Sequence, residues 1–175
     1  ESSPEGWQME QIYPAIKALP SPQNRFDVAN AMLPSLTNLP SMDRRFRVMI
    51  IDAQLELGKF ETAYTEAKTF LELYPRAGDG WRVFAIAAAR TDKPFEADRA
   101  WKTITERSDP RRDIWWEGMI SRATIRAEST RPEAACEIME EIRARKTQMP
   151  ATMDGQISEL DSKVKAVVNC GPATT

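Results

Sequence analysis

The sequence predicts an all-α protein, and three observations support that fold class. Apolar or small residues recur at intervals of three and four along most of the chain, which is the spacing that lines one face of a helix. Seven glycines among 175 residues is a low count, and the helix-favouring residues Ala, Glu, Arg, Leu and Met are plentiful. A chain of this length with 42% apolar residues can bury one core, so we expect residues 1–175 to form a single domain.

The clearest helical pair lies in residues 78–110, where a helix, a short polar turn and a second helix end at Asp109 and Pro110. Each helix has one apolar face, and the two faces consist of Trp81, Phe84, Ala85 and Ala88, then Ala97, Trp101 and Ile104. This order of aromatic, large and small residues resembles the 34-residue unit of the tetratricopeptide repeat family. The resemblance implies a right-handed α-solenoid built from helix-turn-helix repeats.

The segments on either side of this pair fit the repeat less completely. Residues 44–75 match in their second half, where the turn, the second helix and the stop are given by Gly58, Phe60, Ala63, Ala67, Phe70 and Pro75. Residues 113–149 place Trp116 on the first aromatic position, but their turn is about three residues longer before Ala135. We therefore expect repeats over both segments, with altered local geometry in the second.

The two ends of the chain depart further from the pattern. Residues 1–40 have the character of a degenerate repeat, in which Pro14 and Pro34 should kink or break the helices. Residues 154–170 resemble the capping helix of a repeat array, with one apolar face and a polar opposite face. We expect seven or eight helices in all, no sheet, and successive antiparallel pairs.

Several classes of function are excluded or disfavoured by composition. The chain has no histidine, so Ser-His-Asp and Cys-His catalytic sites and histidine-containing metal motifs are excluded. It has no glycine-rich phosphate loop and no calcium loop, so no metal and no cofactor is implied. The net charge is −2 with both signs interleaved, and no run of eighteen apolar residues occurs, so we expect neither nucleic-acid binding nor direct membrane insertion.

One enzymatic alternative rests on Glu128 and Ser129. Helical glycan-cleaving enzymes of the lytic transglycosylase kind, which resemble goose-type lysozyme, carry a catalytic glutamate followed by a serine. The repeat pattern instead places Glu128 in a turn between helices, where a solvated glutamate needs no function. We expect no enzyme, and the two readings differ in whether Glu128 lies in a cleft facing a second carboxylate or in an open turn.

The resemblance also implies where a partner would bind. In tetratricopeptide arrays the first helix of each pair lines a concave groove that receives peptides or extended segments. On this chain the groove positions fall on Arg45, Val48, Asp52, Arg82, Ile86, Arg90, Glu117 and Ser121. We expect a non-enzymatic protein-protein interaction module or assembly scaffold, with another protein as partner and with positive charge at the centre of the groove.

The tryptophans admit two interpretations. Three of them, Trp81, Trp101 and Trp116, occupy repeat core positions and should be packing residues. Trp115 and Trp7 lie off those positions, so each is either an aromatic anchor for a partner or a ring that a neighbouring helix buries. Self-association through Trp115 or the degenerate first repeat is a further alternative.

The two cysteines, Cys136 and Cys170, bear on the compartment. If the last repeat ends near Met149 and the cap begins near Ile157, antiparallel residues face each other when their numbers add to about 306, which pairs these cysteines. A disulfide would then staple the cap to the last repeat and place the protein outside the cytoplasm, periplasmic or secreted, with an upstream signal or anchor removed. The alternative is two unrelated small core residues in a cytoplasmic protein.

Overall fold

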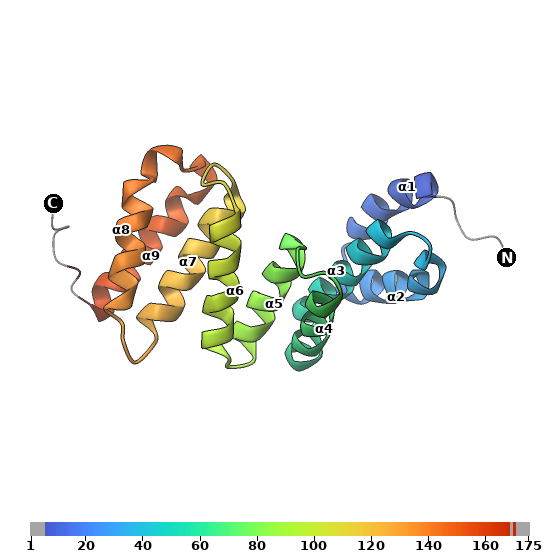
Figure 1. Cartoon of the computed structure of the whole chain (residues 1–175), viewed down its shortest axis with the longest axis horizontal. Coiled ribbons are helices and arrows are strands. Elements are labelled where there is room, and N and C mark those ends of the chain that lie inside the picture. The colour runs from blue at the N-terminus through green and yellow to red at the C-terminus, as the bar shows by residue number, and fades with distance from the viewer. Residues whose placement is uncertain (1–5, 169, 171–175) are drawn as a thin grey trace. The chain divides into compact units, whose positions relative to one another are not determined.

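The computed structural model of the chain describes residues 6–168 and 170, which form α-helices and short 3-10 helices with no strand among them (Figure 1). This confirms the all-α prediction, although the described part holds nine α-helices where we expected seven or eight. The chain divides into two compact units, Glu1–Asp92 and Lys93–Thr175, which we call unit 1 and unit 2. Their boundary falls inside the predicted repeat 78–110, between its two helices.

The described residues of unit 1 form five α-helices. These are α1 (Gly6–Lys17), α2 (Pro22–Met32), α3 (Pro40–Glu56), α4 (Phe60–Leu73) and α5 (Gly78–Arg90), with a 3-10 turn at Leu33–Leu36. Each helix packs against the next one along the chain, and α3 also contacts both α1 and α5. The first helices of successive pairs therefore lie against one another through α3.

In the described part of unit 2 there are four α-helices. These are α6 (Pro94–Arg107), α7 (Asp113–Ala127), α8 (Ala134–Ala144) and α9 (Asp154–Val167), with 3-10 turns at Lys146–Gln148 and Ala151–Met153 between the last two. Helix α7 packs against α6, α8 and α9. It is therefore the central helix of this unit.

Proline and left-handed residues set several helix boundaries. Helices α2, α3 and α6 begin at a proline, whose missing N–H leaves no donor unpaired in a first turn. Helices α3 and α5 are each followed by a residue with positive φ, Gly58 at 73° and Asp92 at 56°, which turns the chain into the next helix. These two residues are 34 positions apart in the sequence.

The two prolines near the N-terminus behave differently from each other. Pro34 lies in the 3-10 turn that ends α2, so the expected break occurs there. Pro14 lies inside α1, which continues to Lys17, so the expected break is wrong at this position. Ala18 N–H still donates to Pro14 O at 3.0 Å, because a proline removes only its own donor.

The second helix of each pair has a buried alanine near its start. Ala63, Ala97 and Ala135 are fully buried near the starts of α4, α6 and α8. The later positions that the same spacing predicts are buried as well. They are Ala67 and Phe70, Trp101 and Ile104, and Met139 and Ile142. The repeat pattern therefore identified the core-facing side of these three helices.

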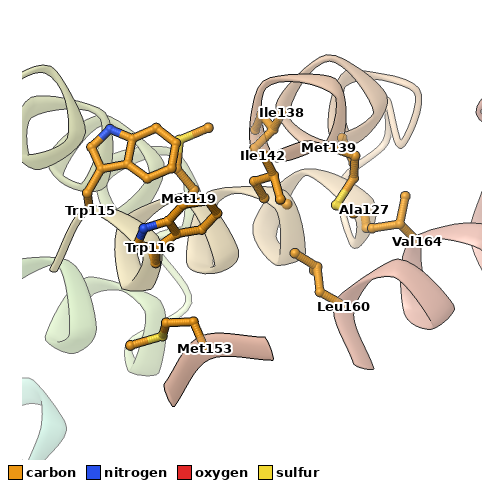
Figure 2. Packing of buried hydrophobic residues seen from close by; sticks show 12 residues of the cluster. Trp115, Trp116, Met119, Ala127, Ile138, Met139, Ile142, Met153, Leu160 and Val164 are labelled. Atoms are coloured by element: carbon orange, nitrogen blue, oxygen red, sulfur yellow. The ribbon is translucent and has the colours of Figure 1, made fainter. Parts of the chain in front are cut away.

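The core of unit 2 is built around two adjacent tryptophans on α7 (Figure 2). The rings of Trp115 and Trp116 lie at 74° to each other with centroids 4.8 Å apart. Trp115 is only 3% exposed, and the Arg145 guanidinium lies over its ring. Of the two interpretations of Trp115, the structure shows the buried ring and not an accessible anchor.

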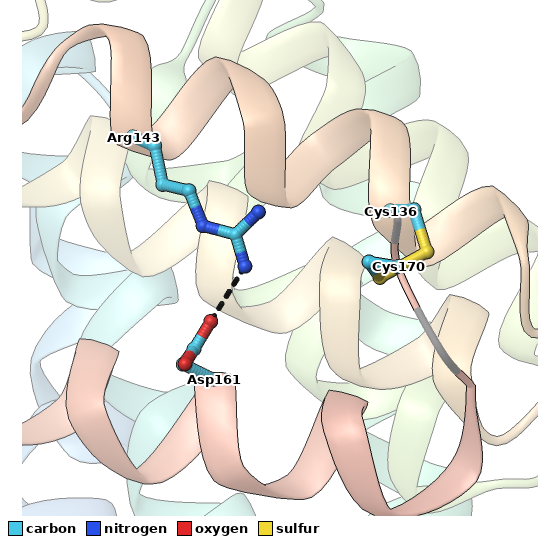
Figure 3. Close-up of a disulfide and its surroundings, with 4 residues drawn as sticks. All are labelled: Cys136, Arg143, Asp161 and Cys170. Carbon is cyan, nitrogen blue, oxygen red and sulfur yellow. Dashed lines mark hydrogen bonds and ion pairs between the residues drawn. A yellow bond between two sulfur atoms is a disulfide. The ribbon is translucent and has the colours of Figure 1, made fainter. Parts of the chain in front are cut away.

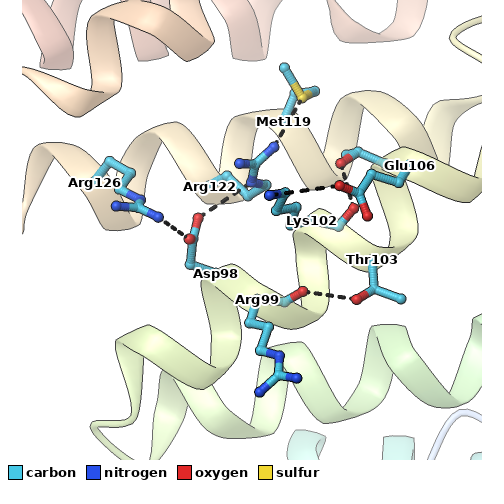
Figure 4. Close-up of polar contacts among 9 residues, drawn as sticks. Asp98, Arg99, Lys102, Thr103, Glu106, Met119, Arg122 and Arg126 are labelled. Atoms are coloured by element: carbon cyan, nitrogen blue, oxygen red, sulfur yellow. Dashed lines mark hydrogen bonds and ion pairs between the residues drawn. The ribbon is translucent and has the colours of Figure 1, made fainter.

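A buried carboxylate joins α6 to α7 (Figure 4). Asp98 is 5% exposed and accepts hydrogen bonds from Arg122 Nε at 3.3 Å and from Arg126 Nη2 at 2.5 Å. Both arginines come from α7, so the two cations compensate the buried charge. The repeat pattern gave no signal for this contact.

The two cysteines lie at bonding distance, with Cα atoms 5.4 Å apart (Figure 3). Cys136 is on α8, and Cys170 lies beyond the end of α9. Nearby, Arg143 Nη2 donates to Asp161 Oδ1 at 2.7 Å across the same two helices. Lys165 and Arg143 together lower the pKa of Asp161 through hydrogen bonds. The predicted pairing is therefore confirmed, although α8 ends at Ala144 and not near Met149, and α9 begins at Asp154 and not near Ile157.

Removing the disulfide should destabilise unit 2. The replacement of both Cys136 and Cys170 by serine is expected to lower the free energy of unfolding by about 4 kcal/mol, because the bond closes a loop with a sequence separation of 34. Chemical denaturation of the oxidised protein and the variant measures the difference. Reductant should lower the stability of the natural chain and leave the variant unchanged. Two free thiols on unreduced protein would contradict the pairing.

A glycine on α5 should be required for its close contact with α4. A Cβ atom at Gly80 would lie 2.3 Å from Cε1 of the buried Phe70, whereas a Cβ at Gly78 would meet nothing within 4 Å. Gly80→Ala should therefore lower the free energy of unfolding by about 1–3 kcal/mol. Gly78→Ala is the matched control and should be neutral or stabilising. Equal effects of the two substitutions in urea denaturation would show that α4 and α5 do not approach this closely.

Candidate binding groove

A cavity of about 910 Å³ lies within unit 1 and is lined mainly by α1, α3 and α5. We call it the unit 1 groove. Its lining residues are Tyr13, Lys17, Arg25, Val48, Met49, Asp52, Leu55, Glu56, Phe60, Asp79, Arg82, Val83, Ile86 and Arg90. Since α1, α3 and α5 are the first helices of successive pairs, the groove lies on the side where the repeat resemblance predicts it.

The floor of the groove is apolar. Val48 and Met49 on α3 and Val83 on α5 are buried, while Leu55 and Ile86 keep part of their side chains accessible. Val48 and Leu55 are seven residues apart on α3, and Val83 and Ile86 are three apart on α5, so each pair lies on one side of its helix. The floor can therefore receive apolar side chains from a ligand.

A carboxylate and a guanidinium meet across α3 and α5. Arg82 Nη1 lies 3.8 Å from Asp52 Oδ1, and both side chains are half-exposed. Burial raises the pKa of Asp52. The positive charges of Arg82 and Lys17 oppose this rise, and the negative charges of Glu56 and Asp79 add to it. The middle of the groove therefore holds a weakly paired charge of each sign.

Three cations line the groove near helix ends: Lys17 is the last residue of α1, Arg25 lies in the first turn of α2, and Arg90 is the last residue of α5. Arg25 donates to Leu19 O at 2.5 Å and forms an ion pair with Glu56. The Arg90 guanidinium lies over the Phe60 ring, 5.7 Å from its centroid. Lys17 and Arg90 have no carboxylate within ion-pair distance in the described part of the chain. This end of the groove therefore carries more positive than negative charge.

The predicted groove residues divide into those that line the groove, those that lie in unit 2, and Arg45. Val48, Asp52, Arg82, Ile86 and Arg90 all line the unit 1 groove. Glu117 and Ser121 are half-buried on α7 in unit 2, and they are described with that unit alone. Arg82 lies 3.8 Å from Asp52 of the neighbouring helix, and positive charge at the centre of the groove stays a prediction.

Arg45 has a structural partner instead of a place in the groove lining. Its Nη1 donates to Glu10 Oε2 at 2.7 Å, and its guanidinium lies 4.0 Å from the centroid of the Tyr13 ring. The hydrogen bond to Glu10 is the largest cause that raises the pKa of Arg45. Arg45 therefore ties α3 to α1 at the edge of the groove.

Sequence reasoning missed the contribution of α1 and of the helix ends. Tyr13 and Lys17 are four residues apart on α1, and that spacing could have placed both on one face. Arg25, Phe60 and Asp79 lie in the first turns of their helices, and they reach the groove because of how those helices pack. No local pattern could have identified them.

Glu128 lies in an open turn. It is exposed at the C-terminal cap of α7, and Ser129 Oγ donates to Arg126 O at 2.7 Å as part of the same turn. Within the described residues no group of histidine, cysteine or acidic side chains is arranged to hold a metal ion. None of the described helices is both long and apolar enough to cross a membrane.

Comparison with protein-family models, with curated proteins and with solved structures found no match to this chain.

The carboxylate of Asp52 should reduce stability at neutral pH. Because its pKa is raised in the folded chain, the fold favours the protonated acid, and stability should fall as pH rises above the unfolded value near 3.8. Asp52→Asn should raise the free energy of unfolding at pH 7 by less than about 1 kcal/mol, since the side chain is half-exposed and screened. The gain should shrink towards pH 4.

Urea denaturation between pH 4 and pH 7 measures this difference. Glu72→Gln removes one exposed carboxylate from α4 of the same unit and should show no such trend. A loss of stability in Asp52→Asn at pH 7 would mean that the attraction of Arg82 outweighs the cost of burial.

Proposed function

We propose that this chain is a small tetratricopeptide-like array that acts as a non-enzymatic protein-protein interaction module or assembly scaffold. Its unit 1 groove binds an extended segment of a partner protein. The single observation that carries the proposal is the accessible groove of about 910 Å³ formed by α1, α3 and α5. An apolar floor with charged sides suits a segment whose side chains alternate between the floor and the rim.

Two local contacts support the repeat assignment, and each lies within one unit. Trp81 Nε1 donates to Pro75 O at 2.9 Å in unit 1, and Trp116 Nε1 donates to Pro110 O at 2.6 Å in unit 2. Each acceptor lies six residues before its tryptophan, at the stop that precedes the first helix of a pair. Repetition of one hydrogen bond at equivalent positions is what a duplicated helix pair would produce.

The position of Glu128 supports a binding role over the glycan-cleaving alternative. A general acid of that kind needs a second carboxylate across a cleft that holds the sugar. Glu128 instead caps α7 in an exposed turn, and it contributes nothing to the unit 1 groove. The open turn was the arrangement expected of a glutamate without a catalytic role.

The cysteine pair supports a location outside the cytoplasm, periplasmic or secreted. Reducing systems keep cytoplasmic thiols apart, whereas an oxidising compartment preserves a bond between Cys136 and Cys170. A partner would then be sought among proteins of the same compartment.

Binding of partner proteins should depend on the unit 1 groove. Arg82→Glu with Arg90→Glu reverses two charges in the lining and should weaken binding at least about tenfold, because both side chains would contact a bound segment. Helicity should not change, since neither side chain belongs to the buried core. Affinity capture with quantitative mass spectrometry identifies the partners and compares their recovery.

The matched control is Lys68→Glu with Arg76→Glu. These residues are exposed in unit 1, lie outside the groove lining and give the same change in charge. Partners that are lost from the control and retained by the groove variant would place the binding surface elsewhere.

A further inference from the structure

The order of charges along the unit 1 groove points to a partner of a particular kind, and this inference rests on the proposed function. We infer that the groove binds a short extended segment with an acidic side chain at one end, apolar side chains in the middle and a basic side chain at the other end. The acidic side chain lies by Lys17 and Arg90, and the basic one lies by Asp79.

Helix α5 sets the distance between the two ends. Asp79 is in its first turn and Arg90 is its last residue, and both line the groove. The rise of an α-helix separates them by about 16 Å. An extended chain covers that distance in about five residues.

The end with Arg90 can accept a carboxylate. Lys17 and Arg90 are both exposed, and Arg25 beside them is paired with Glu56. The Arg90 guanidinium lies over the Phe60 ring, and its planar set of N–H donors matches a carboxylate. Lys17 and Arg90 each offer a ligand a cation that lacks an ion-pair partner among the described residues.

The end with Asp79 can accept a cation. Asp79 is exposed, and its Oδ1 accepts the N–H of Gly80 at 3.0 Å in the first turn of α5. No arginine or lysine lies within ion-pair distance of its carboxylate in the described part of the chain. A lysine or arginine of the ligand would supply the missing opposite charge.

The middle of the groove favours apolar side chains. Asp52 and Arg82 place one charge of each sign there, so an added charge would be attracted by one of them and repelled by the other. Val83 and Ile86 lie between the two charged ends on α5, and Met49 and Leu55 face them from α3. Two apolar residues of the ligand would cover this floor.

The same balance disfavours a polyanion as the ligand. Four cations line the groove, but three carboxylates lie among them. Binding of nucleic acid gains affinity from a succession of cations along the phosphate backbone. A protein segment with charges of both signs fits this lining better.

A selection of random peptides on the immobilised 175-residue chain tests the inference. Peptides retained by the natural chain should carry one acidic and one basic residue on either side of an apolar centre. Lys17→Glu with Arg90→Glu should change the selected peptides to two basic ends, and Asp79→Lys should change them to two acidic ends. Lys68→Glu with Arg76→Glu should leave the original pattern. Each peptide should lose at least about tenfold in affinity on the variant that opposes its charges.

The design separates failure of this inference from failure of the proposed function. Ile86→Asn and Leu55→Asn place a polar group on the floor without altering charge, and circular dichroism reports whether each variant is folded. One outcome is that the peptides lose affinity for the Ile86→Asn or Leu55→Asn variant while the charge variants select the same charge pattern as the natural chain. That result would overturn the inference and leave the proposed function standing. If the folded floor variants retain the peptides as well as the natural chain does, both are wrong.

Discussion

The structure depends on close contacts between helices that carry very small residues where they meet. Ala63, Ala97 and Ala135 are each fully buried, and the space beside Gly80 is too small for one methyl group because of Phe70. A larger side chain at such a point would hold two helices apart and open the core around it. The unit 1 groove depends on the same contacts, since its width is set by how α5 lies against α3 and α4.

The helices, their apolar faces and the cysteine pair could be predicted from the sequence because each follows from periodicity. The spacing of Ala97, Trp101 and Ile104 places all three on one side of a helix before any neighbour is known. Val48, Asp52 and Arg82 were assigned to the groove in the same way, through the repeat resemblance. Cys136 and Cys170 lie together as the antiparallel numbering predicts, although Cys170 lies beyond the end of α9.

The contacts of charged side chains could not be predicted, because periodicity fixes the face of a residue and not its neighbour. Arg45 was placed in the groove, but it lies against Glu10 and Tyr13 of α1, a helix whose packing is not encoded locally. Asp98 is buried with two arginines of α7, although its own helix suggested only a polar position. Trp115 left two interpretations open for the same reason, and packing in unit 2 decided between them.

The distribution of tryptophan has a practical consequence for how the two units can be observed. Three of the five indoles, Trp101, Trp115 and Trp116, belong to unit 2 and are buried there. Intrinsic fluorescence of the native chain therefore reports mainly on unit 2, whereas the groove belongs to unit 1. Trp81, one residue before Arg82 on α5, is the natural optical probe closest in sequence to the groove lining. A change in emission that follows occupation of the groove would have to be sought against the background of the other four rings.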